Sequence, residues 1–162
     1  MFLFHVSRRA VETWLFPFSP RSTKHVEALF TGILYYLIMV LAIARSPVAN
    51  VNWIIVIIFL MAQVLQFASI SITSRVRGPQ MRHVPLADLS ILHRYVLCPH
   101  FLAEFIIYAV FGHVSGWNPI MTVNFVFVLL NQASAAAATR KWYLRSFPRA
   151  KYRPKALIPL IF

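Results

Sequence analysis

Three polar side chains lie at four-residue intervals in one apolar segment of the chain: His100, Glu104 and Tyr108. This interval places all three on one face of an α-helix. A carboxylate within an apolar helix is costly unless a cation or a ligand satisfies it. Two interpretations of Glu104 therefore stay open. It is a near-surface carboxylate that pairs with Arg94 or a cation of the C-terminal tail, or it is a site carboxylate that binds a hydroxyl or amide of a ligand.

Two other segments carry polar stripes. The stripe near the N-terminus consists of His5, Arg8, Arg9 and Glu12. Such a stripe is typical of a helix that lies in the membrane interface or contacts another subunit. The second stripe consists of Gln63, Gln66 and Ser69. Their three-residue spacing within an apolar segment predicts that they face a neighbouring helix or a cavity.

The common catalytic and binding motifs are absent from the sequence. It contains no HExxH, Walker, GxGxxG or GxSxG pattern. Cys98 is the only cysteine, which excludes an internal disulfide and a CxxC metal site, and we expect no metal. Four glycines in all cannot form a glycine-rich phosphate loop. Any nucleotide would therefore be held by arginine, tyrosine and asparagine side chains.

Apolar stretches of membrane-spanning length alternate with basic segments. The predicted spans are 28–44, 52–72, 101–117 and 119–138. Fifteen of the sixteen Lys and Arg residues precede the first span, separate the second from the third, or follow the fourth. Because cationic loops resist translocation, both termini and the central loop are expected on one side. The predicted fold is an all-α polytopic membrane helix bundle with four transmembrane helices, an N-terminal amphipathic helix (1–18) and a basic C-terminal tail (139–162).

Composition supports one membrane domain over residues 1–162. The chain is 59% hydrophobic with a net charge of +12, and a soluble domain of this size is rarely so apolar or so poor in acids. The cations flank the spans, so we expect them to bind anionic phospholipid such as cardiolipin rather than nucleic acid. The candidate headgroup ligands are Arg75, Arg77, Arg140, Lys141 and Arg145.

Several stretches resemble the steroid 5-alpha-reductase C-terminal domain family, and its polyprenol reductase branch in particular. The stretches are CPHFLAEFIIY (98–108), NQASAAAATRKWYLRSF (131–147), KALIPLIF (155–162) and HVSRRAVETW (5–14), with GILYY at 32–36. The resemblance covers nearly the whole chain. The closing KALIPLIF and the LAE segment are fairly specific when they occur together.

The resemblance implies a multi-span membrane enzyme that uses NADPH to reduce a carbon–carbon double bond or a related enone or enal. It also implies seven spans that enclose substrate and cofactor. Carried over by position, Glu104 would contact the nicotinamide side of the cofactor and Tyr143 the cofactor near the seventh helix. Asn131 and Arg77 would lie near its polar groups. If the chain is active, Glu104 and Tyr143 are its catalytic candidates.

The sequence also departs from the family pattern. The chain starts inside what would be the third helix, so one wall of the pocket is expected to be absent. The tyrosine proton donor of the steroid enzymes falls at Val6. Four cofactor-contacting positions are changed, to His100, Arg140, Ala150 and Pro154. Because hydride transfer needs a closed, preorganised site, these changes predict that no NADPH is bound.

Two hypotheses follow. The favoured one is a non-catalytic accessory subunit of a larger membrane complex, set in the mitochondrial inner membrane, for example in a respiratory-chain or ATP synthase complex. Its partners would be other membrane subunits and anionic phospholipid. The alternative is an NADPH-dependent reductase of a polyprenoid or steroid-like lipid, located in the endoplasmic reticulum.

Overall fold

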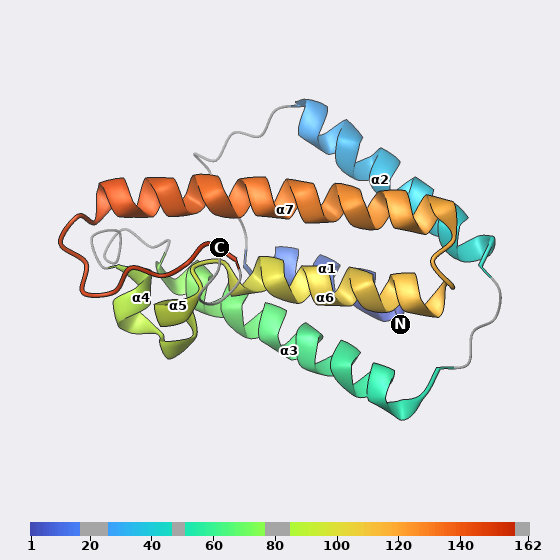
Figure 1. Ribbon diagram of the computed structural model, residues 1–162, viewed down its shortest axis with the longest axis horizontal. Helices are drawn as coiled ribbons and strands as arrows, with labels where there is room; N and C mark the ends of the chain where they lie inside the picture. The colour runs from blue at the N-terminus through green and yellow to red at the C-terminus, as the bar shows by residue number, and fades with distance from the viewer. Residues whose placement is uncertain (17–25, 47–50, 77–84, 158–162) are drawn as a thin grey trace.

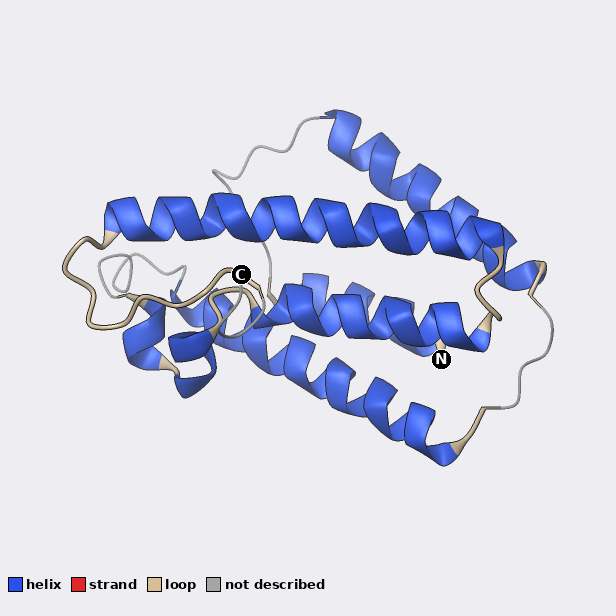
Figure 2. Cartoon of the chain, viewed as in Figure 1, coloured by secondary structure: helices blue, strands red, loops and turns tan. Residues whose placement is uncertain are grey.

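The computed structural model describes residues 1–16, 26–46, 51–76 and 85–157, with only the backbone for residues 26–29. The described residues form helices joined by turns (Figures 1 and 2). Five are of at least three turns: α1 (Phe2–Leu15), α2 (Val26–Ala44), α3 (Trp53–Val76), α6 (Pro99–Val114) and α7 (Pro119–Ser146). Two are short, α4 (Leu86–Leu89) and α5 (Ile91–Tyr95), and they occupy part of the predicted central loop. The predicted all-α class is confirmed over the described ranges.

The helices α3 and α7 are long and apolar enough to cross a membrane. Two further apolar helices are shorter than such a span: the part of α2 from Phe30 to Ala44, and α6. The chain thus has two candidate membrane-spanning helices among its described residues, and the count of four spans stays a prediction. Along the bundle α3, α6 and α7 run in alternating directions (Figure 1).

Two predicted helix ends differ from the structure. The helix α6 ends at Val114 rather than Trp117, because Gly116 and Trp117 take positive φ values of 65° and 52° that end a right-handed helix. The helix α7 continues to Ser146, so the first part of the predicted tail is helical. The segment after 138 contains no glycine or proline until Pro148, and nothing in it stops the helix earlier.

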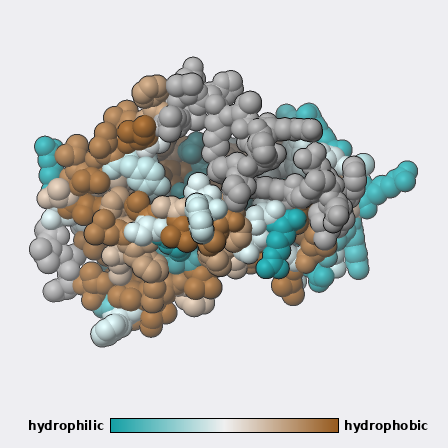
Figure 3. All heavy atoms as spheres, turned by 180° about the vertical axis from the view of Figure 1, so that it is seen from behind, coloured by the Kyte–Doolittle hydropathy of each residue, from teal (hydrophilic) through white to brown (hydrophobic). Residues whose placement is uncertain are grey.

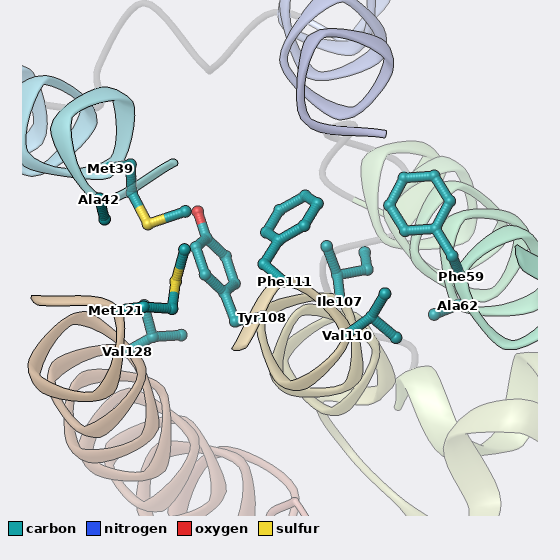
Figure 4. Packing of buried hydrophobic residues seen from close by; sticks show 10 residues of the cluster. All are labelled: Met39, Ala42, Phe59, Ala62, Ile107, Tyr108, Val110, Phe111, Met121 and Val128. Carbon is teal, nitrogen blue, oxygen red and sulfur yellow. The ribbon is translucent and has the colours of Figure 1, made fainter. Parts of the chain in front are cut away.

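The helix α6 lies at the centre of the bundle and packs against both α3 and α7, while α2 packs against α7. Its Tyr108 ring projects between α6 and two methionines, Met39 of α2 and Met121 of α7, and Phe111 lies beside it (Figure 4). Tyr108 is 1% exposed. Residues of α2, α6 and α7 thus pack around the Tyr108 side chain.

The segment after α7 folds back along the start of α6. Leu97 N donates to Lys155 O at 2.8 Å, and Lys155 N donates to Tyr95 O at 3.0 Å, so the two segments pair in parallel over a single bridge. A second buried cluster, which includes Tyr143 and Leu157, lies beside this pairing. The returning segment therefore fixes the end of the bundle where α4 and α5 meet α6.

The helix α1 buries its polar face and exposes its apolar one. His5 and Glu12 are 1% and 2% exposed, whereas Leu3 and Trp14 are about 80% exposed (79% and 82%). The polar stripe thus faces α3 and α6, and not a membrane surface or another subunit, which are the two settings that the sequence predicts. Hydrophobic side chains cover much of the visible surface, and hydrophilic ones gather at the end that carries α4, α5 and the chain after α7 (Figure 3). Both features suit a chain that is largely surrounded by lipid.

Replacement of Gly112 by alanine should destabilise the chain by about 1–3 kcal/mol. A Cβ at Gly112 would stand 2.5 Å from the Trp117 ring, so the turn between α6 and α7 must shift. Gly32 is the matched control, because a Cβ there meets nothing within 4 Å. Gly32→Ala should stabilise α2 by about 0.5–1 kcal/mol, as alanine favours helix. Unfolding in detergent micelles measures both variants, and equal stability of the two would contradict the expected clash.

A polar cavity between α2, α6 and α7

A cavity of about 520 Å³ lies where α2, α6 and α7 meet. Its polar lining consists of Thr31, Tyr35, Tyr36, Glu104, Tyr108, Asn131 and Gln132. The carboxylate of Glu104 therefore shares one space with two side-chain amides and several hydroxyls. Such a set can donate hydrogen bonds to a carbonyl oxygen of a ligand and can accept hydrogen bonds from the N–H groups of a carboxamide.

Glu104 is held from the other side by α3. Gln66 Nε2 donates to Glu104 Oε2 at 3.3 Å. The described ion pairs do not include Glu104, and the Arg94 guanidinium lies instead over the Tyr152 ring at 4.9 Å. The predicted pairing of Glu104 with Arg94 is thus absent from the described part of the chain, and the carboxylate faces the cavity.

The α1 stripe completes this network. Arg8 donates through Nη2 to Gln66, through Nη1 to Glu12, and through Nε to Gln63. Arg9 Nη1 donates to Glu12 Oε2 at 2.6 Å. Gln63, Gln66 and Ser69 are all at most 3% exposed, which confirms that the α3 stripe faces neighbouring helices. The network links α1, α3 and α6 behind Glu104.

His5 lies at the edge of this network. Its Nδ1 is 3.1 Å from Gln63 Nε2, and its ring packs edge-on against Tyr108 and Phe111. Burial, opposed by the Gln63 hydrogen bond and reinforced by the nearby Arg8, lowers the pKa of His5 to about 4. The imidazole is therefore neutral in the folded chain at neutral pH.

Acid should unfold the chain partly through His5. Its folded pKa of about 4 is below the unfolded value of 6.5, so the unfolded chain binds more protons and stability falls as the pH drops below 6.5. By pH 4 the loss from this group is about 3 kcal/mol. Unfolding in detergent between pH 7 and 4 should show a smaller loss for His5→Gln than for the wild type. His113→Gln, at an exposed position, should keep the wild-type loss, and an unchanged profile in His5→Gln would contradict this role.

A second, apolar cavity of about 450 Å³ adjoins the first. It runs between α2 and the first half of α7, and shares Thr31, Tyr35 and Phe127 with the polar cavity. Its wall is otherwise apolar except for Asn124, which is 4% exposed and whose Nδ2 has no hydrogen-bond partner among the described residues. The two spaces together can hold a ligand with a polar end and an apolar chain.

The structure brings some of the predicted site residues together and separates others. Glu104 and Asn131 line the same cavity. Tyr143 does not line it: it is 1% exposed in the second cluster and its hydroxyl donates to Tyr152 O at 3.5 Å. Along α7 the 12 residues from Asn131 to Tyr143 span about 18 Å. Arg77 lies outside the described residues, so its predicted cofactor contact stays a prediction.

The predicted headgroup ligands differ in their surroundings. Arg75, Lys141 and Arg145 are exposed near one end of the bundle. Arg140 is partly buried and its Nε donates to Pro154 O at 3.0 Å, so this cation also anchors the returning segment. Arg77 lies in the undescribed range. Binding of anionic phospholipid at these positions stays a prediction.

Comparison with known proteins decides the family. A family model described as 3-oxo-5-alpha-steroid 4-dehydrogenase matches residues 28–162. The chain belongs to this family. The family's similar members include Polyprenal reductase 1 of Oryza sativa subsp. indica, 27% identical over 96% of this chain and 56% of that protein. Polyprenal reductase 2 of Arabidopsis thaliana is 25% identical over 98% of this chain and 58% of that protein.

The similarity is strongest over part of the chain. Polyprenal reductase of Xenopus tropicalis is 41% identical over 68 residues, which are 41% of this chain and 22% of that protein. The chain spans slightly more than half the length of the first two family members it matches. The resemblance to the polyprenol reductase branch is confirmed.

The favoured hypothesis of a non-catalytic accessory subunit is wrong. The named relatives that match nearly the whole chain are reductases, and none of them is named as a subunit of a complex. The mitochondrial setting depended on that hypothesis and has no support from these relatives. Four positions differ from the family pattern, but two of the expected site residues, Glu104 and Asn131, line one cavity.

Proposed function

We propose that the chain forms the site of an NADPH-dependent reductase that acts on a polyprenoid lipid, in which it saturates the double bond conjugated to an aldehyde. The relatives are named polyprenal reductases, and a polyprenal joins a small polar head to a long apolar chain. The observation that carries the proposal is the junction of a polar and an apolar cavity at Thr31, Tyr35 and Phe127. The aldehyde would face the polar space and the isoprenoid chain the apolar one.

The polar cavity has the chemistry for the nicotinamide end of the cofactor. Glu104 supplies a carboxylate acceptor for the carboxamide N–H groups, and Asn131 and Gln132 supply amide donors and acceptors. Bound NADPH would supply the hydride. The cations Arg140, Lys141 and Arg145 lie further along α7, where they can bind phosphate groups.

The reaction balances without a metal or a second reductant. Hydride adds to the β-carbon of the enal, a proton from water adds to the α-carbon, and the aldehyde is retained. We place this activity in the endoplasmic reticulum membrane, the location that accompanied the reductase hypothesis, and not in mitochondria.

The direct test is reduction of a polyprenal by the purified chain in detergent or vesicles. The expected result is NADPH oxidation matched one to one by an aldehyde that is saturated between its α- and β-carbons. Product analysis by mass spectrometry separates this aldehyde from an allylic alcohol, which would show carbonyl reduction instead. A folded chain that neither binds NADPH nor converts the polyprenal would contradict the proposal.

A further inference from the structure

We infer that Tyr35 is a catalytic residue that donates a hydrogen bond to the carbonyl oxygen of the substrate. The inference rests on the proposed function, because it assigns a role within the same site. Tyr35 projects from α2 and lines both cavities at their junction. The aldehyde is the polar end of the polyprenal and is attached directly to the apolar chain, so its carbonyl group would lie at that junction with the oxygen toward the polar cavity.

The hydroxyl of Tyr35 is available for such a bond. Its oxygen is buried, and apart from an interaction with the Tyr108 side chain it has no hydrogen-bond partner within 3.5 Å among the described residues. A buried hydroxyl without a partner costs about 1–3 kcal/mol, so sites of this kind are typically completed by a ligand or water. Asn124 Nδ2 is the other unpartnered donor in these walls, but it belongs to the apolar cavity alone.

The surrounding rings hold Tyr35 in place. Its ring centroid lies 5.7 Å from that of Tyr108 and 5.8 Å from that of Phe127, and both contacts are tilted. Tyr108 belongs to the packed core of α6. The hydroxyl is therefore presented from a fixed ring, which is the preorganisation that stabilisation of developing charge requires.

The assignment also identifies a hydroxyl that could act in place of the tyrosine that is replaced by valine at position 6. The tyrosine that donates a proton in the steroid enzymes falls at Val6 by resemblance, and α1 has no hydroxyl there. Tyr35 supplies a phenol from a different helix. As hydride adds to the β-carbon, negative charge moves to the carbonyl oxygen, and the Tyr35 O–H stabilises this enolate until water protonates the α-carbon. Tyr35 keeps its proton at the end.

The test compares Tyr35→Phe with wild type in kinetics and in the infrared spectrum of a bound substrate. Loss of one donor to an oxyanion lowers kcat by about 100–1000-fold. We expect that loss in Tyr35→Phe with little change in the KM for NADPH. We also expect the carbonyl stretch of a bound two-isoprene polyprenal, labelled with ¹³C at the carbonyl, to lie at higher frequency than in wild type. Tyr95→Phe, at an exposed position on α5, is the matched control and should behave as wild type.

The outcomes separate this inference from the proposed function. If wild type does not turn over but its carbonyl band lies below that of Tyr35→Phe, the proposed function fails and the binding role of Tyr35 stands. If Tyr35→Phe keeps kcat within threefold of wild type, or its carbonyl band does not move, Tyr35 is not the donor. A band shift in Asn124→Leu in place of Tyr35→Phe would assign the bond to Asn124 and overturn the inference. Equal unfolding midpoints in detergent show that the phenylalanine variant is folded.

Discussion

Glu104→Gln should lower kcat/KM for NADPH about 100-fold while the chain stays folded. Replacement of a carboxylate by an amide removes a charge-assisted acceptor, and such bonds are worth about 1.5–3 kcal/mol. The fold should survive because Gln66 can still donate to the amide oxygen of the new side chain. Steady-state kinetics with NADPH varied at saturating polyprenal measure the effect.

Asp88→Asn is the control for this prediction. Asp88 is an exposed carboxylate on α4 and does not line the polar cavity, so its variant should keep wild-type kinetics. An unchanged kcat/KM for NADPH in Glu104→Gln would show that the cofactor does not contact this carboxylate. In that event the contact implied by the family resemblance would not apply to this chain.

Glu12→Leu should destabilise the chain by about 3–5 kcal/mol, the largest stability effect that we expect. The Glu12 side chain is 2% exposed and pairs with both Arg8 and Arg9. Its removal leaves Arg8, whose side chain is 13% exposed, without a carboxylate partner. Loss of one partner is unfavourable because the remaining buried charge has lost its water of hydration and has no opposite charge in exchange.

Unfolding by SDS titration of the chain in mixed micelles measures this change. Thr13→Ala, at the exposed neighbouring position, should stay within about 0.5 kcal/mol of wild type. Glu12→Gln should lie between the two, since the amide keeps an acceptor for one arginine. Wild-type stability of Glu12→Leu would mean that the arginines find other partners and that the network contributes little.

The prediction about function failed for an identifiable reason. The hypothesis of a non-catalytic subunit depends on the composition, the short chain and the changed positions, whereas the resemblance to reductases covers nearly the whole chain. Yet two of the changed positions have structural roles in this chain. Arg140 anchors the segment after α7 and Pro154 is buried within it, so both have structural contacts of their own. A substitution at a family position therefore need not remove the site.

Sequence alone determined the helical class, the location of the apolar segments and the family. These depend on local composition and on intervals of three or four residues, which are properties of the chain itself. The α3 stripe was predicted to be buried for the same reason, since amides in an apolar segment must find partners.

Only the tertiary structure decided which polar residues share a space. Glu104 meets Gln66 of α3 on one side and a cavity walled by α2 and α7 on the other, although 38 residues separate Glu104 from Gln66. The orientation of α1, with its polar face inward, and the position of Tyr35 at the junction of two cavities are likewise set by how the helices pack. Periodicity identifies the faces of a helix, but the helix that each face meets depends on contacts between distant segments, which no local pattern encodes.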